Sequence, residues 1–138
     1  MIGAVLDRSA IASWARLDQY MVAWMMRAED ASRPLLIATG ELTHALAATE
    51  TLHEVETIGH LTETGITVPS PAGDLTSQLA FYLADVMRDA KDADLGQAHT
   101  LILALAGEWP ILSATPHLWA DLSPGISLKV LSGRDPSN

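Results

Sequence analysis

The sequence of 138 residues contains no cysteine. A disulfide framework and a thiolate zinc site are therefore both excluded. Long apolar runs are also missing, and the longest ones fall far short of the ~20 residues that a membrane-spanning helix needs. The opening residues, MIGAVLD, carry no basic leader and reach an acid after a few apolar residues. We therefore expect no signal peptide, no membrane partner and a cytoplasmic protein.

Basic residues are scarce. Eight lysines and arginines stand against seventeen acidic residues, and the net charge is −9. The basic residues are scattered and form no run. An acidic balance disfavours long-range attraction to phosphate backbones and anionic membranes. The composition therefore argues against a plain nucleic-acid-binding module, and any handling of RNA or DNA would need cations.

The composition is that of a folded protein, with 49% hydrophobic and 18% charged residues. We expect a single domain over residues 1–132 and a flexible tail over 133–138. Short apolar segments alternate with amphipathic helical patterns, which predicts an α/β fold around a mainly parallel sheet. We expect strands within 3–7, 35–39, 110–113 and 126–131, a strand or loop at 66–71, helices over 9–26, 40–64, 74–92 and 94–107, and a short helix or turn at 116–125. The helix over 40–64 would be capped by Thr39, broken near Gly59 and ended by Gly65, and the helix over 94–107 would end at Gly107.

Acidic and hydroxyl side chains follow the predicted strands. Asp7 ends the first strand, Glu41 lies just past the second, Asp94 opens a helix, and Ser113 and Thr115 end a later strand. The carboxyl ends of parallel strands meet at one edge, where ligands bind. Three carboxylates brought together repel one another unless a divalent cation neutralises them, and all-oxygen ligands suit Mg²⁺ or Mn²⁺. The other interpretation is local: Asp94 caps a helix, and Glu41 stabilises the first turn of one.

Three segments resemble the motifs of PIN-domain proteins in their order and spacing. VLDRSAI resembles the first strand, with Asp7 followed after one residue by Ser9; LLIATGELTHAL resembles the second motif and places Glu41 there. DADLGQAHTLILALAGEWPILSATP resembles the third, with Asp94 ahead of Ala98-His99, and LWADLSPGISLKVL resembles the closing segment. The resemblance spans nearly the whole chain and is strongest to the small toxin ribonucleases of bacterial toxin–antitoxin modules.

This resemblance implies a three-layer α/β/α sandwich and a divalent-metal-dependent endoribonuclease. Asp7, Glu41 and Asp94 would be both the catalytic residues and the ligands of Mg²⁺ or Mn²⁺, which activates water and stabilises charge on the scissile phosphate. Ser9, Ser113 and Thr115 would be supporting residues. RNA would be the substrate, an antitoxin protein a partner, and the chain a homodimer.

Two positions depart from the family pattern. Thr115 stands where many members have an aspartate, so a second metal would be weakened and Thr115→Asp should tighten divalent binding. Arg8 stands where the family has a small residue or threonine. It would either pair with a site acid or a phosphate, or be a solvated arginine that points away from Asp7; we favour the solvated arginine slightly. Ser9 would bond to a metal-bound water or to a local backbone group.

Two further groups of residues have alternative interpretations. The stretch with Trp14, Met21, Trp24, Met25 and Met26 is either core or a dimer or partner surface, since aromatics and methionine are enriched at interfaces. The five histidines lack zinc-type spacing. We place His99 on a helix near the rim of the site and the others on the surface: His44, His53, His60 and His117.

Three hypotheses for function follow. The first is a metal-dependent endoribonuclease, the toxin of a toxin–antitoxin pair. The second is a PIN-like domain that has lost catalysis and acts as a binding or regulatory module, which Arg8, Thr115 and the acidic net charge favour. The third is an α/β domain unrelated to this family. The three acids in the expected order place the nuclease first.

Overall fold

The computed structural model describes residues 3–63, 67–68, 76–122 and 126–131. The predicted tail at 133–138 lies outside the described residues. The strands are short and form one sheet of order β3-β2-β1-β4-β5 in which every pair is parallel. The prediction of an α/β protein with a parallel sheet is confirmed, and residues 66–71 do contribute an edge strand. The strands are β1 (Ala4–Leu6), β2 (Leu35–Ile37), β3 (Thr67–Val68), β4 (Ile111–Ser113) and β5 (Leu128–Val130).

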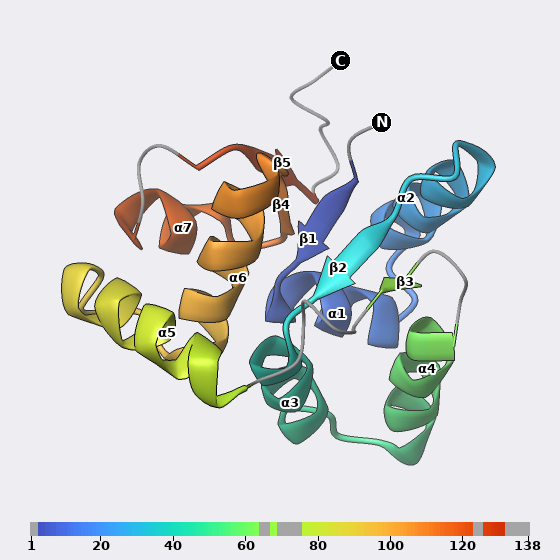
Figure 1. Cartoon of the computed structure of the whole chain (residues 1–138). Helices are drawn as coiled ribbons and strands as arrows, with labels where there is room; N and C mark the ends of the chain where they lie inside the picture. Colours follow the sequence, from blue (N-terminus) through green and yellow to red (C-terminus); the bar gives the residue numbers. More distant parts are fainter. Residues whose placement is uncertain (1–2, 64–66, 69–75, 123–125, 132–138) are drawn as a thin grey trace.

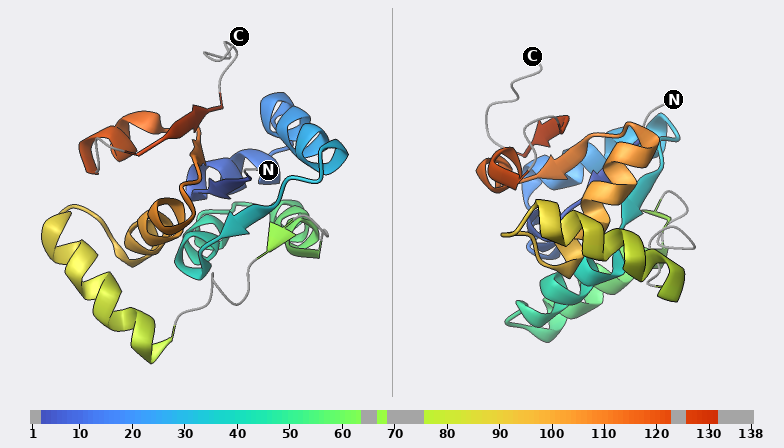
Figure 2. Two further views of the ribbon diagram at one scale, coloured as in Figure 1. Left: turned by 45° about the horizontal axis from the view of Figure 1, so that its top comes forward. Right: turned by 60° about the vertical axis from the view of Figure 1, so that its left-hand side comes forward.

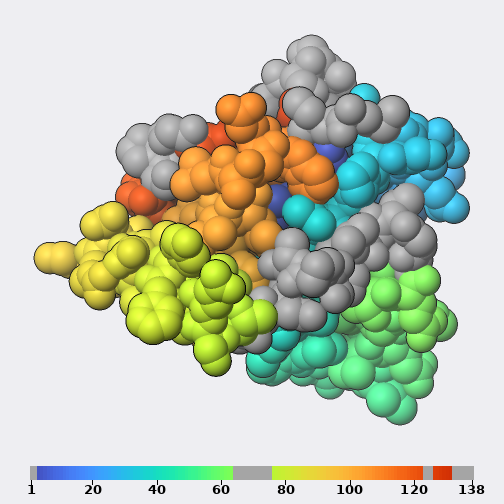
Figure 3. All heavy atoms as spheres, viewed as in Figure 1, coloured from blue at the N-terminus to red at the C-terminus, as the bar shows by residue number. Residues whose placement is uncertain are grey.

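Helices cover both faces of the sheet, as Figures 1 and 2 show. One face packs against α1, α2 and α4, and the other against α6 and α7. The α5 helix packs mainly on α6, and Figure 3 shows the two helices side by side on one face of the molecule. The α3 helix lies at the end of the sheet toward which β2 points (Figure 1). The helices are α1 (Arg8–Ala15), α2 (Gln19–Asp30), α3 (Thr39–Ala47), α4 (Leu52–Glu63), α5 (Ser77–Asp89), α6 (Leu95–Gly107) and α7 (Pro116–Leu122).

The central strand β1 is buried on both faces because its side chains alternate between two apolar clusters. Leu6 joins the cluster beneath α1, α2 and α4, whereas Val5 joins the cluster with Ile111 and Trp119. Burial on both faces is the reason that these strands read as continuous apolar runs in the sequence.

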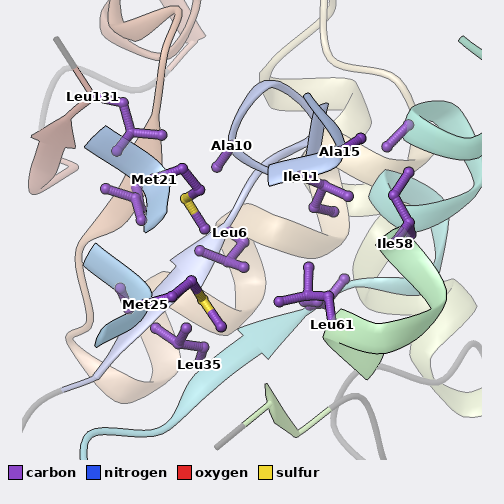
Figure 4. Close-up of a cluster of buried hydrophobic side chains, with 14 of the residues drawn as sticks. Leu6, Ala10, Ile11, Ala15, Met21, Met25, Leu35, Ile58, Leu61 and Leu131 are labelled. Carbon is purple, nitrogen blue, oxygen red and sulfur yellow. The ribbon is translucent and has the colours of Figure 1, made fainter. Parts of the chain in front are cut away.

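The methionines of α2 belong mainly to the core. Met21 and Met25 are buried and point toward Leu6 and Leu35 (Figure 4). Trp14 packs against the same cluster and donates its indole N–H to the Thr57 carbonyl at 2.9 Å. Of the stretch considered above as an interface, Met26 is exposed and Trp24 is partly buried. The core interpretation therefore holds for Met21 and Met25.

Two predicted helices are each divided in two. The helix expected over 9–26 stops at Ala15, because Leu17 adopts a left-handed conformation (φ 54°), and α2 then starts with Asp18 as its N-cap. The apolar spacing continues across this break, which is why the sequence predicted one helix. The Asp18 carboxylate accepts from two backbone amides of the new helix, and that capping marks the start of α2.

The helix expected over 40–64 is divided between α3 and α4, not at Gly59. The Glu54 carboxylate accepts from the backbone amides of Glu50 and Thr51, while the Glu54 amide donates to the Thr51 hydroxyl. This reciprocal bonding starts α4 at the sequence TLHE, a capping-box pattern. Gly59 lies within α4, and the end expected at Gly65 falls outside the described residues.

Candidate functional site

The sheet topology brings the sequence-predicted acids to one edge. Leu6 pairs in register with Ile37 of β2 and Leu112 of β4, so the three strands end at the same level. Asp7 directly follows β1 and is the N-cap of α1. In Figure 1 the arrowheads of β1 and β2 point toward α1 and α3. We call this end of β1, β2 and β4 the carboxyl edge of the sheet.

Glu41 and Asp94 meet because α3 and α6 touch at their first turns. A Cβ on Gly40 would lie 2.7 Å from the Gly96 Cα, and a Cβ on Gly96 would lie 2.8 Å from Glu41 Oε1 and 2.9 Å from the Glu41 backbone nitrogen. Only glycine permits this approach without a shift of the backbone. Two glycines, one beside each acid, therefore set the distance between the helices that carry the carboxylates.

Arg8 bridges the two acids. Its Nε and Nη2 donate to Glu41 Oε1 at 3.0 and 2.7 Å, and Nη2 also contacts Asp94 Oδ1 and Oδ2 at 2.7 and 2.6 Å. The Arg8 backbone amide donates to Glu41 Oε2 at 2.5 Å. Glu41 therefore satisfies a free amide in the first turn of α1 as well as the guanidinium. We call these three residues the Arg8–Glu41–Asp94 cluster.

This arrangement corrects the interpretation of Arg8. The solvated arginine that we favoured slightly is wrong, and the alternative in which Arg8 pairs with site acids is confirmed. The physical reason is the buried Glu41 side chain, which is 1% exposed and needs a nearby cation or proton. Arg8 stands one residue after the end of β1 and has a long enough side chain to reach it. Its own side chain remains 30% exposed.

Asp7 lies in a different environment, buried but with uncharged partners. Its Oδ2 accepts from the Trp119 indole N–H at 2.7 Å, and its Oδ1 accepts from the Ser9 hydroxyl at 2.6 Å and the Ala10 amide at 2.9 Å. The last bond caps α1, whose N-terminal dipole favours a negative charge. The expected convergence of three acids is therefore only partial: Glu41 and Asp94 share one cation, and Asp7 is hydrogen-bonded to neutral donors.

The supporting hydroxyls gather beside Asp7. Ser9 accepts the Ala114 amide at 2.8 Å, so the local backbone interaction considered for Ser9 is present. The Ser113 hydroxyl lies 3.3 Å from that of Ser9 and 3.4 Å from that of Thr115, and it accepts the Thr115 amide at 2.9 Å. Ser9, Ser113 and Thr115 thus form a neutral, connected network where β4 ends.

The charges of the cluster affect one another. Burial raises the pKa of the Glu41 carboxyl above its usual value, and the hydrogen bonds and charge of Arg8 oppose that rise. Burial acts in the same direction on Asp94, but the hydrogen bonds from Arg8 and the Gln97 amide outweigh it and lower the pKa of Asp94. Burial acts to lower the pKa of Arg8, yet its bonds to the two carboxylates raise it overall. The guanidinium therefore stays charged.

The residues present do not fit a divalent metal while Arg8 holds this position. Every carboxylate oxygen of Asp7, Glu41 and Asp94 already accepts a hydrogen bond from a protein donor. In the part of the chain that the structure describes, no group of three or more His, Asp or Glu side chains is arranged to hold a metal ion. The donor type suits Mg²⁺ or Mn²⁺, but the oxygens point at N–H and O–H groups instead.

Both local interpretations of the acids are confirmed alongside this cluster. Asp94 is the N-cap of α6 and forms a capping box with Gln97, and Glu41 lies in the first turn of α3. One smaller expectation is corrected, because Thr39 is the first residue of α3 rather than its cap. The helix end expected at Gly107 is confirmed, and the left-handed residue that follows it is Glu108 (φ 55°).

Sequence reasoning missed two participants. Trp119 donates to Asp7 across 112 positions of sequence, and a tryptophan in a helix gives no signal of such a bond. His44 is exposed, as expected, but its Nε2 lies 3.7 Å from Asp94 Oδ2. His44 follows Glu41 at i+3 on α3, and this spacing places both on one side of the helix. His53, His60 and His117 are exposed, and His99 is fully buried on α6.

Comparisons with known proteins add no relative: no family model matches the chain, and no curated protein matches it. Within the described residues, no helix is both long and apolar enough to cross a membrane.

Proposed function

We propose that this chain is a PIN-like domain that has kept the fold and given up metal-dependent RNA hydrolysis, and that it works as a binding or regulatory module. The observation that carries the proposal is the Arg8 guanidinium bonded to both Glu41 and Asp94. Catalysis of the implied kind needs these carboxylates to face a divalent cation. In this chain they face a guanidinium that belongs to the protein itself.

Two other features support a non-hydrolytic role. Thr115 provides a hydroxyl instead of a fourth carboxylate, and its neighbours at the end of β4 are also neutral. The net charge of −9 disfavours association with an RNA backbone. We expect a module of this kind to contact another protein, because the basic residues of the sequence are scattered and form no run that would attract a nucleic acid.

The experiment is a paired measurement on the purified chain. Diffraction data from crystals soaked in millimolar Mn²⁺ report occupancy by anomalous scattering, and incubation of structured and single-stranded RNA with Mg²⁺ or Mn²⁺ reports cleavage. We expect no anomalous peak among Asp7, Glu41 and Asp94 and no cleavage above that of a Glu41→Gln control. Metal-dependent cleavage that the control lacks would overturn the proposal.

The second candidate is the metal-dependent endoribonuclease, most simply the toxin of a toxin–antitoxin pair. One observation favours it: Arg8 and Asp94 are about a third exposed, with side-chain values of 30% and 39%. An ion pair in contact with water is weak, so the Arg8 guanidinium could move away and uncover Glu41 Oε1 and the carboxylate of Asp94. RNA cleavage in the experiment above, lost in Glu41→Gln, would establish this candidate.

A further inference from the structure

We infer that Arg8 is a resident cation of the carboxyl edge, which excludes divalent metal ions from Glu41 and Asp94 by occupying their shared position. The inference rests on the proposed function and deepens it, because it names the residue that keeps metal away. It also gives the reason for the proposed loss of metal binding: the acids are present, and an arginine side chain lies between Glu41 and Asp94 where a metal ion would bind.

The first argument is charge. Glu41 is fully buried and receives all its hydrogen bonds from Arg8, so its ionised form depends on the positive charge of that residue. The Arg8 guanidinium supplies one positive charge to two carboxylates, and His44 Nε2 lies 3.7 Å from the more exposed of the two. Without Arg8, two carboxylates that now lie within hydrogen-bond distance of the same nitrogen would have no guanidinium between them. A small divalent cation would then be the best available replacement.

The second argument is geometry. Arg8 contacts the Glu41 carboxylate at two points, because its backbone amide donates to Oε2 and its guanidinium donates to Oε1. The guanidinium Nη2 also donates to both carboxylate oxygens of Asp94. The fork of N–H donors matches the two carboxylates in a way that a flexible ammonium would not. Arg8 is therefore held in the site and not merely attracted to it.

The third argument is that the acids stay in place without Arg8. Asp94 is held as the N-cap of α6 by the Gln97 amide, and Glu41 sits against Gly96 where α3 and α6 touch. Asp7 is fixed separately by Trp119 and the first turn of α1. Removal of the guanidinium thus leaves carboxylates that are already positioned, and the cost of ordering ligands for a metal ion is small.

The test is the affinity for Mn²⁺ of four forms of the full chain, measured by isothermal titration calorimetry and by the Mn²⁺ electron paramagnetic resonance signal. The forms are the natural chain, Arg8→Ala, Arg8→Lys and Arg16→Ala. We expect Arg8→Ala to bind Mn²⁺ about tenfold or more tightly than the natural chain, because the substitution removes both the occupant and its repulsion of other cations. Arg16→Ala, which removes an exposed arginine next to α1, should change nothing.

Arg8→Lys keeps the charge without the fork, so its gain in Mn²⁺ affinity should be clearly smaller than that of Arg8→Ala. The double variant Arg8→Ala/Glu41→Gln should lose the gain, since it removes a ligand. If Arg8→Ala does not fold, Arg8→Gln serves instead, because glutamine preserves volume and a hydrogen-bond donor while removing the charge.

The outcomes separate the two ideas. Tight Mn²⁺ binding by the natural chain would contradict the proposed function itself. Equal weak binding by the natural chain, Arg8→Ala and Arg8→Gln would leave the non-hydrolytic function standing but overturn the role of Arg8. A gain in Arg8→Lys as large as that in Arg8→Ala would overturn the assignment of exclusion to the positive charge.

Discussion

Asp7 and Glu41 are both buried carboxylates at the carboxyl edge of the sheet, yet they are stabilised in different ways. Asp7 receives three hydrogen bonds from neutral groups, two of them within three residues along the chain. Glu41 receives its bonds from a single arginine, 33 positions away. Neutral donors orient the Asp7 carboxyl group, whereas Arg8 supplies one positive charge that Glu41 and Asp94 share. The edge thus contains one acid bonded to neutral groups and one pair of acids whose charge the protein itself partly offsets.

The largest effect on stability should come from a change at Asp7, the acid that is bonded to neutral donors. Trp119→Phe removes the indole N–H from a buried carboxylate while preserving an aromatic ring in the core. Hydrogen bonds to charged groups are worth about 1.5–3 kcal/mol, so we expect a loss of about 2 kcal/mol in the free energy of unfolding, measured by urea denaturation.

Trp109→Phe is the matched control for that substitution. Trp109 packs at the margin of the same apolar cluster, and within the described residues its indole donates to no carboxylate. It should lose clearly less stability than Trp119→Phe. Equal losses would mean that ring volume, and not the bond to Asp7, accounts for the effect.

The Arg8–Glu41–Asp94 cluster should be sensitive to the spacing of α3 and α6. Gly96→Ala places a methyl group 2.8 Å from Glu41 Oε1 and 2.9 Å from its backbone nitrogen. Overpacking of this kind costs about 1–3 kcal/mol, partly offset by the ~1 kcal/mol that alanine gains over glycine in a helix. We expect a net loss of about 1 kcal/mol by thermal or urea unfolding.

Gly59→Ala is the matched control, because it replaces a helical glycine with alanine at a position where the new methyl group meets no neighbour. A Cβ at Gly59 meets nothing within 4 Å, and the residue lies inside α4. This variant should be more stable than the natural chain by about 0.5–1 kcal/mol. A stabilised Gly96→Ala protein would show that the close approach of the two helices is not required.

The third prediction concerns pH. The pKa of Asp94 is lowered in the folded chain, so the folded state binds its proton less readily than the unfolded state does. The stability from this group is complete above about pH 4, the unfolded value, and is lost as the pH falls through the lowered pKa.

Asp94→Asn should remove this contribution, and its stability should fall less steeply than that of the natural chain between about pH 4 and pH 2. Because Asp94 is well exposed, the difference at neutral pH should be no more than about 1 kcal/mol. Parallel curves of unfolding free energy against pH would contradict the assignment to Asp94.

The smallest effect should come from the missing fourth acid. With Arg8 in place, Thr115→Asp should tighten Mn²⁺ binding by less than about threefold, because the new carboxylate adds charge but does not remove the occupant. In the Arg8→Ala background the same change should give a larger gain. If Thr115→Asp alone restores tight binding, the absent acid, and not the added arginine, is what keeps metal away.

The positions of Asp7 and Asp94 at the carboxyl edge could be predicted from the sequence, because each depends on residues that are close by in the chain. Asp7 follows an apolar strand directly, and Asp94 precedes a helix with glutamine at the third helical position, a pattern that requires an N-cap. The direction of the Arg8 side chain could not be predicted in the same way. Its partners lie 33 and 86 positions further along the chain, and nothing near Arg8 distinguishes a solvated arginine from a bridging one.

The breaks in the helices follow the same rule. The apolar spacing that continues from α1 into α2 reflects a shared core, in which Ile11 and Met21 belong to one cluster although they lie on different helices. Periodicity alone reports burial and cannot report that the chain turns at Leu17. The capping residue Asp18 was the local signal that marked the turn.

The α/β class, the parallel strands and the positions of the acids along the chain follow from local sequence, because apolar runs, helical spacing and caps act over a few residues. The groups that those acids bind depend on contacts between distant segments. Two glycines bring α3 against α6, and the short path from β1 to Arg8 places a guanidinium between Glu41 and Asp94. The charge of a buried carboxylate must be balanced by whatever group lies within a few ångströms, and that group is set by the fold.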